Sequence, residues 1–186
     1  MPGLTAVLAA ELGFDGSGHL LDVGCGPGVL AVQLAGLVDG VTALDPDAAM
    51  LDQARWHAAA SGIEHIEFVQ ARAEDIASLG LAPMRLVTFG QSFHRTDRLA
   101  VAEAVYDLLE PGGALVLVVH DPDHAALSMS YAAPHLFGDQ LDGFIGELRA
   151  LLAASTTTGR FWDWPGDTAA IIARRPGRSR LDAGGH

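Results

Sequence analysis

Five short apolar runs alternate with longer helical patterns over most of this chain of 186 residues. The runs typical of strands are HLLDVG (19–24), GVTALD (40–45), IEFVQA (66–71), RLVTFG (85–90) and ALVLVVH (114–120). Helices are expected at 3–13, 29–38, 47–62 and 97–113, the last closed by a Pro-Gly-Gly stop. Strands that alternate with helices pair in parallel, so the pattern predicts a doubly wound α/β sheet.

The end of the chain has a different pattern. After a helical segment at 146–155, RFWDW (160–164) and TAAIIARR (168–175) are separated only by PGD, a spacing that suits a hairpin. One strand of that hairpin must run antiparallel to the rest. The expected fold is therefore a Rossmann-like sheet of seven strands, five parallel and two in a C-terminal hairpin. It forms a single domain over residues 1–176, followed by a flexible tail at 177–186.

Composition and charge exclude several function classes. The net charge of −12 argues against nucleic acid or an anionic membrane as a partner, because both demand a positive surface. All eleven basic residues are arginine, and without lysine there is neither a Schiff base to pyridoxal phosphate nor a phosphate-loop lysine. No apolar run reaches a membrane span and the first residues lack the positive start of a signal peptide, so a cytoplasmic protein is expected.

The stretch LLDVGCGPG (20–28) lies between the first expected strand and the helix that follows it. Gly24, Gly26 and Gly28 there allow a ligand to approach the backbone closely, because glycine carries no Cβ. A nicotinamide fingerprint would need glycine or alanine at the sixth position, where this chain has Val29, so that interpretation is disfavoured. The lone cysteine, Cys25, excludes an intrachain disulfide and is expected to pack as a small apolar side chain.

Asp45 ends the second expected strand, at the edge of the sheet where the glycine turn also lies. A carboxylate at this place can accept both hydroxyls of a ribose. Alternatively, Asp45 or Asp47 could cap the next helix, because Asp before Pro or Ala is a good helix start. The two roles are compatible.

These motifs together resemble the class I S-adenosylmethionine-dependent methyltransferases, over residues 18–175. LLDVGCGPG is similar to the glycine motif of that family, VTALDPDAAML to its ribose segment and FVQARAEDI to its adenine segment. LVTFGQSFH and LLEPGGALVLV resemble the segments at its fourth and fifth strands. The FGQSFHRTD stretch is most similar to the small-molecule branch, which includes ubiquinone/menaquinone-type and trans-aconitate-type enzymes.

The resemblance implies S-adenosylmethionine as the cofactor and a position for its methionine part. The backbone of Gly24, Gly26 and Gly28 would pass close to the methionine. Asp22 would lie near its ammonium group, and Gln91 would line the pocket under the sulfonium.

The resemblance also implies a position for the adenosine part. Asp45 would hold the ribose, Met50 would lie against the adenine face, and Ala73 and Glu74 would border the adenine edge. Arg72 stands where many members of the family carry an aspartate, so adenine recognition would fall to the backbone around Ala73.

Two sequence features bear on catalysis. His94 follows the fourth strand and has a pKa range suited to a general base, although it could instead shape the pocket or cap the next helix. The cluster HDPDH (120–124) holds two histidines and two carboxylates, but a contiguous loop rarely folds all its side chains onto one ion. No metal site is therefore expected, and His120 or Asp121 is expected to line the substrate pocket instead.

Residues 122–143 are too long for a minimal connection and carry Met129, Tyr131, His135 and Phe137, which suits an apolar substrate lid. A surface excursion with its own small cluster is the alternative. Trp162 and Trp164 alternate with Asp163, which places both indoles on one face of a strand and favours core packing.

The sequence thus predicts a methyltransferase acting on a small, apolar or ring-containing acceptor, and is compatible with a homodimer. The glycine motif begins only about twenty residues into the chain, whereas small-molecule enzymes of the family usually carry a longer leading segment. The alternative hypothesis is therefore an N-terminally shortened module that binds S-adenosylmethionine or S-adenosylhomocysteine, or serves as a partner subunit, without catalysis.

Overall fold

A computed structural model describes residues 2–119 and 169–176. The described strands are β1 (His19–Val23), β2 (Gly40–Asp45), β3 (Ile66–Gln70), β4 (Met84–Gly90), β5 (Leu109–Val119) and β6 (Ala169–Arg174). The α-helices are α1 (Pro2–Leu12), α2 (Val29–Leu34), α3 (Ala48–Ala60) and α4 (Arg98–Leu108). Three short 3-10 helices, η1 (Ala35–Leu37), η2 (Ala73–Ser78) and η3 (Phe93–Arg95), complete the described elements.

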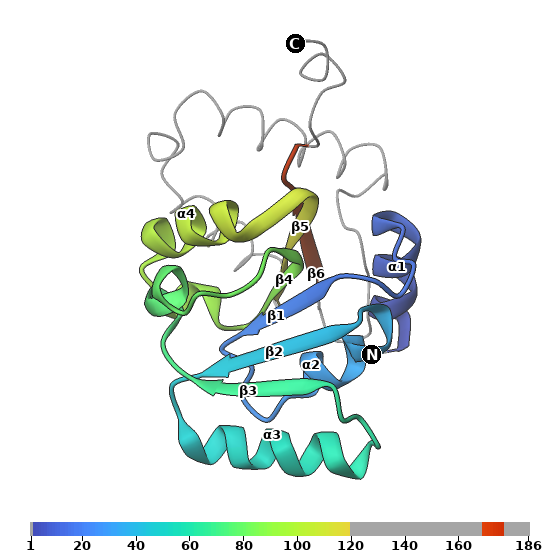
Figure 1. Cartoon of the computed structure of the whole chain (residues 1–186), viewed down its shortest axis with the longest axis vertical. Coiled ribbons are helices and arrows are strands. Elements are labelled where there is room, and N and C mark those ends of the chain that lie inside the picture. The colour runs from blue at the N-terminus through green and yellow to red at the C-terminus, as the bar shows by residue number, and fades with distance from the viewer. Residues whose placement is uncertain (1, 120–168, 177–186) are drawn as a thin grey trace.

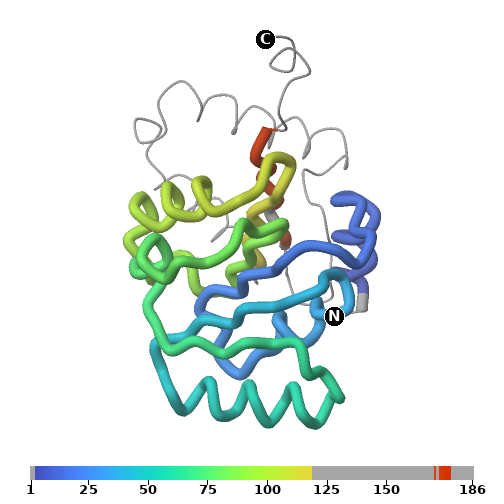
Figure 2. The backbone as a smooth tube through the Cα atoms, viewed as in Figure 1, coloured from blue at the N-terminus to red at the C-terminus, as the bar shows by residue number. Residues whose placement is uncertain are grey.

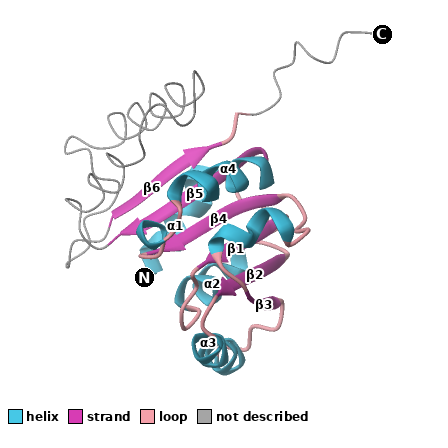
Figure 3. Ribbon diagram, turned by 90° about the vertical axis from the view of Figure 1, so that its left-hand side faces the viewer, coloured by secondary structure: helices cyan, strands magenta, loops and turns pink. Residues whose placement is uncertain are grey.

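The six strands form one sheet in the order β3-β2-β1-β4-β5-β6 (Figure 1). β1 to β5 pair in parallel, and β6 pairs antiparallel to β5. Seen from the side, β3 and β6 are the two edges of this sheet (Figure 3). The doubly wound α/β fold and the antiparallel strand at the C-terminal end are therefore confirmed. The seventh strand expected at 160–164 lies outside the described residues.

Strand order reverses between β1 and β4, which makes this pair the switch point of the sheet. From β1 the chain moves outward through β2 to β3, and then returns to β4 on the other side of β1 (Figure 2). Connections on the two sides diverge from such a point, which leaves a crevice beyond the carboxyl ends of the strands. The glycine turn follows β1 and therefore borders this crevice.

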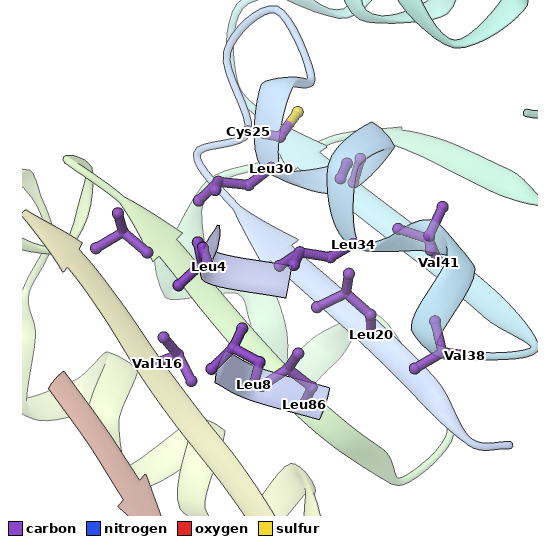
Figure 4. Close-up of a cluster of buried hydrophobic side chains, with 14 of the residues drawn as sticks. Leu4, Leu8, Leu20, Cys25, Leu30, Leu34, Val38, Val41, Leu86 and Val116 are labelled. Atoms are coloured by element: carbon purple, nitrogen blue, oxygen red, sulfur yellow. The ribbon is translucent and has the colours of Figure 1, made fainter. Parts of the chain in front are cut away.

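Helices cover both faces of the sheet, and side chains that alternate along each strand pack against them. One apolar cluster joins Leu20 of β1 and Leu86 of β4 to α1, α2 and α3, with Leu4 and Leu8 of α1 lying over the strands (Figure 4). The cluster on the opposite face joins Leu21 of β1 to η2 and α4. Because both faces of the sheet are covered, the side chains on both sides of each strand are apolar. The strands therefore appear in the sequence as continuous apolar runs.

The boundary between α4 and β5 differs from the sequence prediction. The helix expected at 97–113 ends at Leu108, and the Pro-Gly-Gly sequence belongs to β5. Met84 pairs with Leu109 but Leu86 pairs with Ala114, so a bulge in β5 absorbs the extra residues. Arg175, just after β6, holds the bulge: its carbonyl accepts from the Gly112 N–H at 2.9 Å, and its N–H donates to Gly113 at 2.8 Å.

Within residues 2–119 and 169–176, no helix has both the length and the apolar character needed to cross a membrane. The lid expected at 122–143, the tail at 177–186 and the two tryptophans at 162 and 164 lie outside those ranges.

Candidate functional site

The three glycines of the turn after β1 all have a positive φ, of 64° at Gly24, 53° at Gly26 and 78° at Gly28. A Cβ on Gly24 would lie 2.5 Å from the Ser92 Cβ, and a Cβ on Gly28 would lie 2.9 Å from the Ala54 Cβ. A Cβ on Gly26, by contrast, would have no heavy atom of the described residues within 4 Å, apart from Gly26 itself and its two chain neighbours. Two of the glycines are therefore required by neighbouring protein atoms, and only Gly26 faces open space.

Backbone hydrogen bonds attach this turn to the end of β2. The N–H groups of Gly24 and Cys25 both donate to the carbonyl of Leu44, at 2.7 and 3.0 Å. The Gly28 N–H donates to the Cys25 carbonyl at 3.0 Å, which closes the turn before α2 begins. The open backbone at Gly26 is thus held in a fixed place by its neighbours.

Asp45 is buried at the end of β2 and uses both carboxylate oxygens. Its Oδ2 accepts from the Gly26 N–H at 2.8 Å, and its Oδ1 accepts from the Asp47 N–H at 2.9 Å. Asp47 is the residue that caps α3, because its Oδ1 accepts from the Ala49 N–H at 2.8 Å. The two roles that the sequence left open are therefore divided, with Asp47 at the helix and Asp45 at the turn.

Asp22 lies in β1, and its carboxylate is turned into the protein. It is 1% exposed, accepts from the Thr88 hydroxyl at 2.8 Å, and accepts from the Ala31 N–H of α2 at 3.1 Å. Burial raises the pKa of Asp22 to about 6, although both of these hydrogen bonds act in the opposite direction. This carboxylate therefore ties β1, β4 and the first turn of α2 together.

A cavity of about 620 Å³ opens at the carboxyl ends of β1, β2 and β4. This volume is in the range of pockets for small molecules and cofactors. Its walls come from the glycine turn, the start of α3, η2, and the segment after β4. The lining residues are Val23, Gly24, Gly26, Leu44, Asp45, Pro46, Asp47, Met50, Arg72, Ala73, Glu74, Gly90, Gln91, Ser92, Arg95 and Thr96.

Most of the expected cofactor residues meet at this cavity. Those that line it are Gly24, Gly26, Asp45, Met50, Ala73, Glu74 and Gln91. Asp22 and Gly28 do not line it, because Asp22 is committed to α2 and Thr88, and Gly28 is packed against Ala54 of α3. His94 is exposed within η3 and is not among the lining residues, although Ser92 and Arg95 around it are.

Gln91 has an unusual conformation at the end of β4. Its φ of 59° makes it the only residue other than glycine with a positive φ in the described part of the chain. Its backbone N–H donates to the Val118 carbonyl at 3.0 Å, which fixes it to β5. Its side-chain Nε2 is buried and has no hydrogen-bond partner among the described residues. Such strain and an unsatisfied amide both favour a functional role.

The η2 side of the cavity is held by Glu74. Its Oε1 accepts from the Asp97 N–H at 2.9 Å, and its Oε2 lies 3.4 Å from Arg72 Nε. The hydrogen bond from Asp97 is the main reason that the pKa of Glu74 is lowered, and Arg72 adds to it. Glu74 thus links the segment after β3 to the start of α4.

Cys25 packs among apolar side chains, as the sequence predicts, and is 8% exposed. Burial raises its thiol pKa, and the nearby Asp22 and Asp45 carboxylates raise it further. A reactive cysteine needs a lowered pKa, so Cys25 is a packing residue.

The described residues contain no group of three or more side chains able to hold a metal ion, and the cluster at 120–124 lies outside them.

Sequence reasoning missed Ser92 and Arg95. The Ser92 hydroxyl donates to the Val23 carbonyl at 2.6 Å, which joins the segment after β4 to the end of β1. Arg95 is one of the residues that line the cavity. Both residues lie in the same stretch as Gln91 and His94, so the position after a strand at the switch point was the available signal.

Known proteins share both the sequence pattern and the fold. A family model described as a methyltransferase domain matches residues 20–113, about half of the chain. A ubiquinone biosynthesis O-methyltransferase of Cereibacter sphaeroides is 37% identical over 109 residues, covering 59% of this chain and 43% of the relative. One from Xanthomonas campestris is 32% identical over 124 residues, covering 66% of this chain and 51% of the relative. The chain spans about half the length of the curated relatives it matches.

Solved structures show the same architecture. An rRNA methylase from Streptococcus thermophilus has a TM-score of 0.62 at 19% identity, covering 94% of this chain and 95% of that one. The N-methyltransferase NodS from Bradyrhizobium japonicum also has a TM-score of 0.62, at 14% identity, covering 92% and 93%. At these identities the likeness shows the fold alone.

The family model and the geometry of the glycine turn agree. This chain belongs to the methyltransferase domain family, within the class I S-adenosylmethionine-dependent methyltransferases. The cofactor of that family is S-adenosylmethionine.

Proposed function

We propose that this protein transfers the methyl group of S-adenosylmethionine to a small-molecule acceptor. The observation that carries the proposal is the cavity at the switch point, where the open backbone of Gly26 and the carboxylate of Asp45 meet. The names of the curated relatives favour an oxygen atom as the acceptor and a ring-containing metabolite as its carrier. The net charge of −12 supports a small molecule over nucleic acid.

The lining residues fit the adenosine part of the cofactor. Each oxygen of Asp45 accepts one backbone N–H, and a carboxylate has about four acceptor positions, so two ribose hydroxyls can still bind. Met50 of α3 and Ala73 of η2 supply apolar surface for the adenine. Glu74 borders the same region, with the Arg72 guanidinium beside it.

The glycine turn and Gln91 would contact the methionine part of the cofactor. At Gly26 the space beside the backbone is open, so a ligand can reach the main chain. The buried Nε2 of Gln91 lacks an acceptor within the described residues, and an oxygen atom of the ligand would supply one. Asp22 acts indirectly here, by holding the start of α2 in place.

When bound, S-adenosylmethionine supplies a methyl group on positively charged sulfur. The protein then needs to hold an acceptor in line with that bond and to exclude water, which accounts for much of the rate. His94 is proposed as the base that takes a proton from an acceptor hydroxyl. It lies in η3 between two lining residues, Ser92 and Arg95, which supports this placement.

We propose that residues 1–176 form one domain. The substrate lid expected at 122–143, the seventh strand expected at 160–164 and the tail expected at 177–186 lie outside the described residues. The protein acts in the cytoplasm without a metal and is compatible with a homodimer. The hairpin spacing supports the seventh strand, and the apolar side chains of 122–143 support the lid.

Calorimetric titration of the purified chain with S-adenosylmethionine, S-adenosylhomocysteine and NADH tests the cofactor. We expect micromolar binding of both sulfur ligands and no binding of NADH. Methyl transfer from labelled cofactor to a set of hydroxylated aromatic metabolites tests the activity. Binding without transfer to any acceptor would favour a module that only holds the cofactor, and absence of binding would contradict the proposal.

A further inference from the structure

We infer that Arg95 and Gln91 form a subsite for a carboxylate at the β4 side of the cavity. The inference rests on the proposed function, and it deepens it by naming a chemical class for one ligand group. Both residues line the cavity and both follow β4 within five positions of each other. Neither was assigned to an anionic group by the sequence.

Among the described residues that line the cavity, Arg95 is the arginine without a paired carboxylate. The other lining arginine, Arg72, is paired with Glu74 at 3.4 Å. Arg95 is exposed and, within residues 2–119 and 169–176, makes no ion pair, side-chain hydrogen bond or ring contact. An arginine fork presents five N–H donors that match a carboxylate.

The lining carboxylates do not satisfy Arg95, because each one has another role. Asp45 accepts from Gly26 and Asp47, and Asp47 caps α3. Glu74 accepts from the Asp97 N–H and pairs with Arg72. The negative groups are thus tied to the β2 and η2 sides, and the free positive group belongs to the segment after β4.

Gln91 adds a neutral donor to the same segment. Its Nε2 has no partner among the described residues. Its positive φ sets the direction in which the Cα–Cβ bond leaves the backbone. The terminal amide of glutamine rotates about a broad, two-fold torsion, so its N–H₂ can turn toward an acceptor oxygen. A guanidinium and an amide N–H₂ together suit the two oxygens of a carboxylate.

Two ligands could supply that carboxylate. One is the methionine part of the cofactor, and the other is the methyl acceptor itself. 5′-Methylthioadenosine lacks the amino-acid end of S-adenosylhomocysteine, carboxylate and ammonium together. A smaller preference for S-adenosylhomocysteine over it in Arg95→Gln than in the parent therefore reports on the first source. Small carboxylates compared with their neutral amides, such as benzoate with benzamide and succinate with succinamide, report on the second source.

The experiment measures these affinities for the full chain and for Arg95→Gln. Arg55→Gln is the matched control, because Arg55 is an exposed arginine of α3 that pairs with Asp52 and does not line the cavity. Arg95→Lys keeps the charge without the fork, and Gln91→Glu replaces the donor by a repelling group. The small carboxylates are titrated both with and without S-adenosylhomocysteine. Their affinities can therefore be compared between variants even if S-adenosylhomocysteine fails to bind.

We expect Arg95→Gln to lose about five- to tenfold in affinity for one of the two carboxylate ligands, with the neutral counterparts unchanged. Arg95→Lys should lose less, Gln91→Glu should weaken the same ligand, and Arg55→Gln should match the parent. A loss confined to S-adenosylhomocysteine assigns the subsite to the cofactor, and a loss confined to the small carboxylates assigns it to the acceptor. Equal affinities in Arg95→Gln and the parent for every carboxylate would overturn the inference. Failure of S-adenosylhomocysteine to bind the parent would instead count against the proposed function.

Discussion

The Asp45 Oδ2 atom accepts a hydrogen bond of 2.8 Å from the Gly26 N–H, which joins the end of β2 to the one glycine of the turn that faces open space. The same carboxylate accepts from the Asp47 N–H, at the residue that caps α3. A single side chain therefore sets the position of the open backbone and of the helix beside it. Ligand binding and the shape of the turn depend on the same group.

Replacing Asp45 by asparagine should weaken S-adenosylhomocysteine binding by about 10- to 100-fold, as expected for loss of a charged acceptor. The amide of asparagine keeps one acceptor oxygen, but its N–H₂ group would face one of the two backbone N–H donors. Calorimetric titration of Asp45→Asn measures the effect. Asp52→Asn is the control, since Asp52 is an exposed residue of α3 outside the cavity.

A near-normal affinity in Asp45→Asn would remove Asp45 from the ribose role. Circular dichroism and urea unfolding of the same variant show whether a loss of affinity comes from the ligand contact or from a disordered turn. The backbone N–H that loses its acceptor should by itself lower the free energy of unfolding by about 1–3 kcal/mol. A variant that keeps a native circular dichroism spectrum and a cooperative unfolding transition, yet loses affinity, assigns the loss to the ligand contact.

Alanine substitutions should separate the glycines by the space around them. Gly28→Ala should lower the free energy of unfolding by about 3 kcal/mol, from overpacking and a positive φ together. The new Cβ would lie 2.9 Å from the Ala54 Cβ and 3.2 Å from its Cα, where φ is 78°. Gly26→Ala should cost only about 1 kcal/mol, because its Cβ would enter open space, but should weaken cofactor binding.

Urea unfolding of a double-mutant cycle tests the packing explanation. Ala54→Gly removes the Cβ that Gly28→Ala would meet, at a cost of about 1 kcal/mol for glycine inside a helix. If packing against α3 explains the effect, the double variant should be more stable than the sum of the two single changes predicts. Strict additivity would mean that backbone strain alone accounts for the loss.

The sequence predicted the sheet well because its signals are local. Apolar runs at the right length located β1 to β4 within about one residue, and the glycine motif located the turn. The β5 boundary was wrong because Pro-Gly-Gly is an ordinary helix stop. In this fold the same residues form a strand bulge, and what stabilises it is Arg175, a residue distant in the sequence.

Several of the expected site residues line the cavity because of their position in the backbone, at the ends of strands. Gly24, Gly26 and Asp45 lie at strand ends, and topology alone brings them to the cavity. The sequence predicts Asp22 near the ligand, and in the structure its carboxylate accepts hydrogen bonds from Thr88 and from the Ala31 N–H of α2. The sequence did not indicate Arg95, because its availability to a ligand depends on which neighbouring carboxylates already have partners. Sequence spacing does not contain that information.

Cys25 should be slow to react with thiol reagents in the native protein. Burial and the nearby carboxylates raise its pKa, so little thiolate is present at pH 8. We expect labelling by a disulfide reagent to be at least about tenfold slower than in urea-unfolded protein. Labelling at equal rates in both states would contradict the packing assignment.

The Asp22 carboxyl should make the folded state lose stability as pH rises from about 4 to 6. Its pKa is about 6 in the folded protein against 3.8 for an ordinary aspartate, mainly because of burial. In this window the folded state retains a proton that the unfolded chain has released, so raising the pH favours unfolding. The shift of about two units corresponds to at most ~3 kcal/mol.

Asp22→Asn removes this titration while keeping the shape of the side chain. The amide oxygen can accept from the Ala31 N–H, and the Thr88 hydroxyl can turn to accept from the new N–H₂ group. Because the parent alone loses stability from this group, the stability of Asp22→Asn relative to the parent should rise between pH 4 and pH 7, by up to ~3 kcal/mol. Urea unfolding at several pH values measures the difference, with Asp52→Asn as the exposed control. A difference that stays constant across this range would show that Asp22 ionises in the folded protein as it does in the unfolded chain.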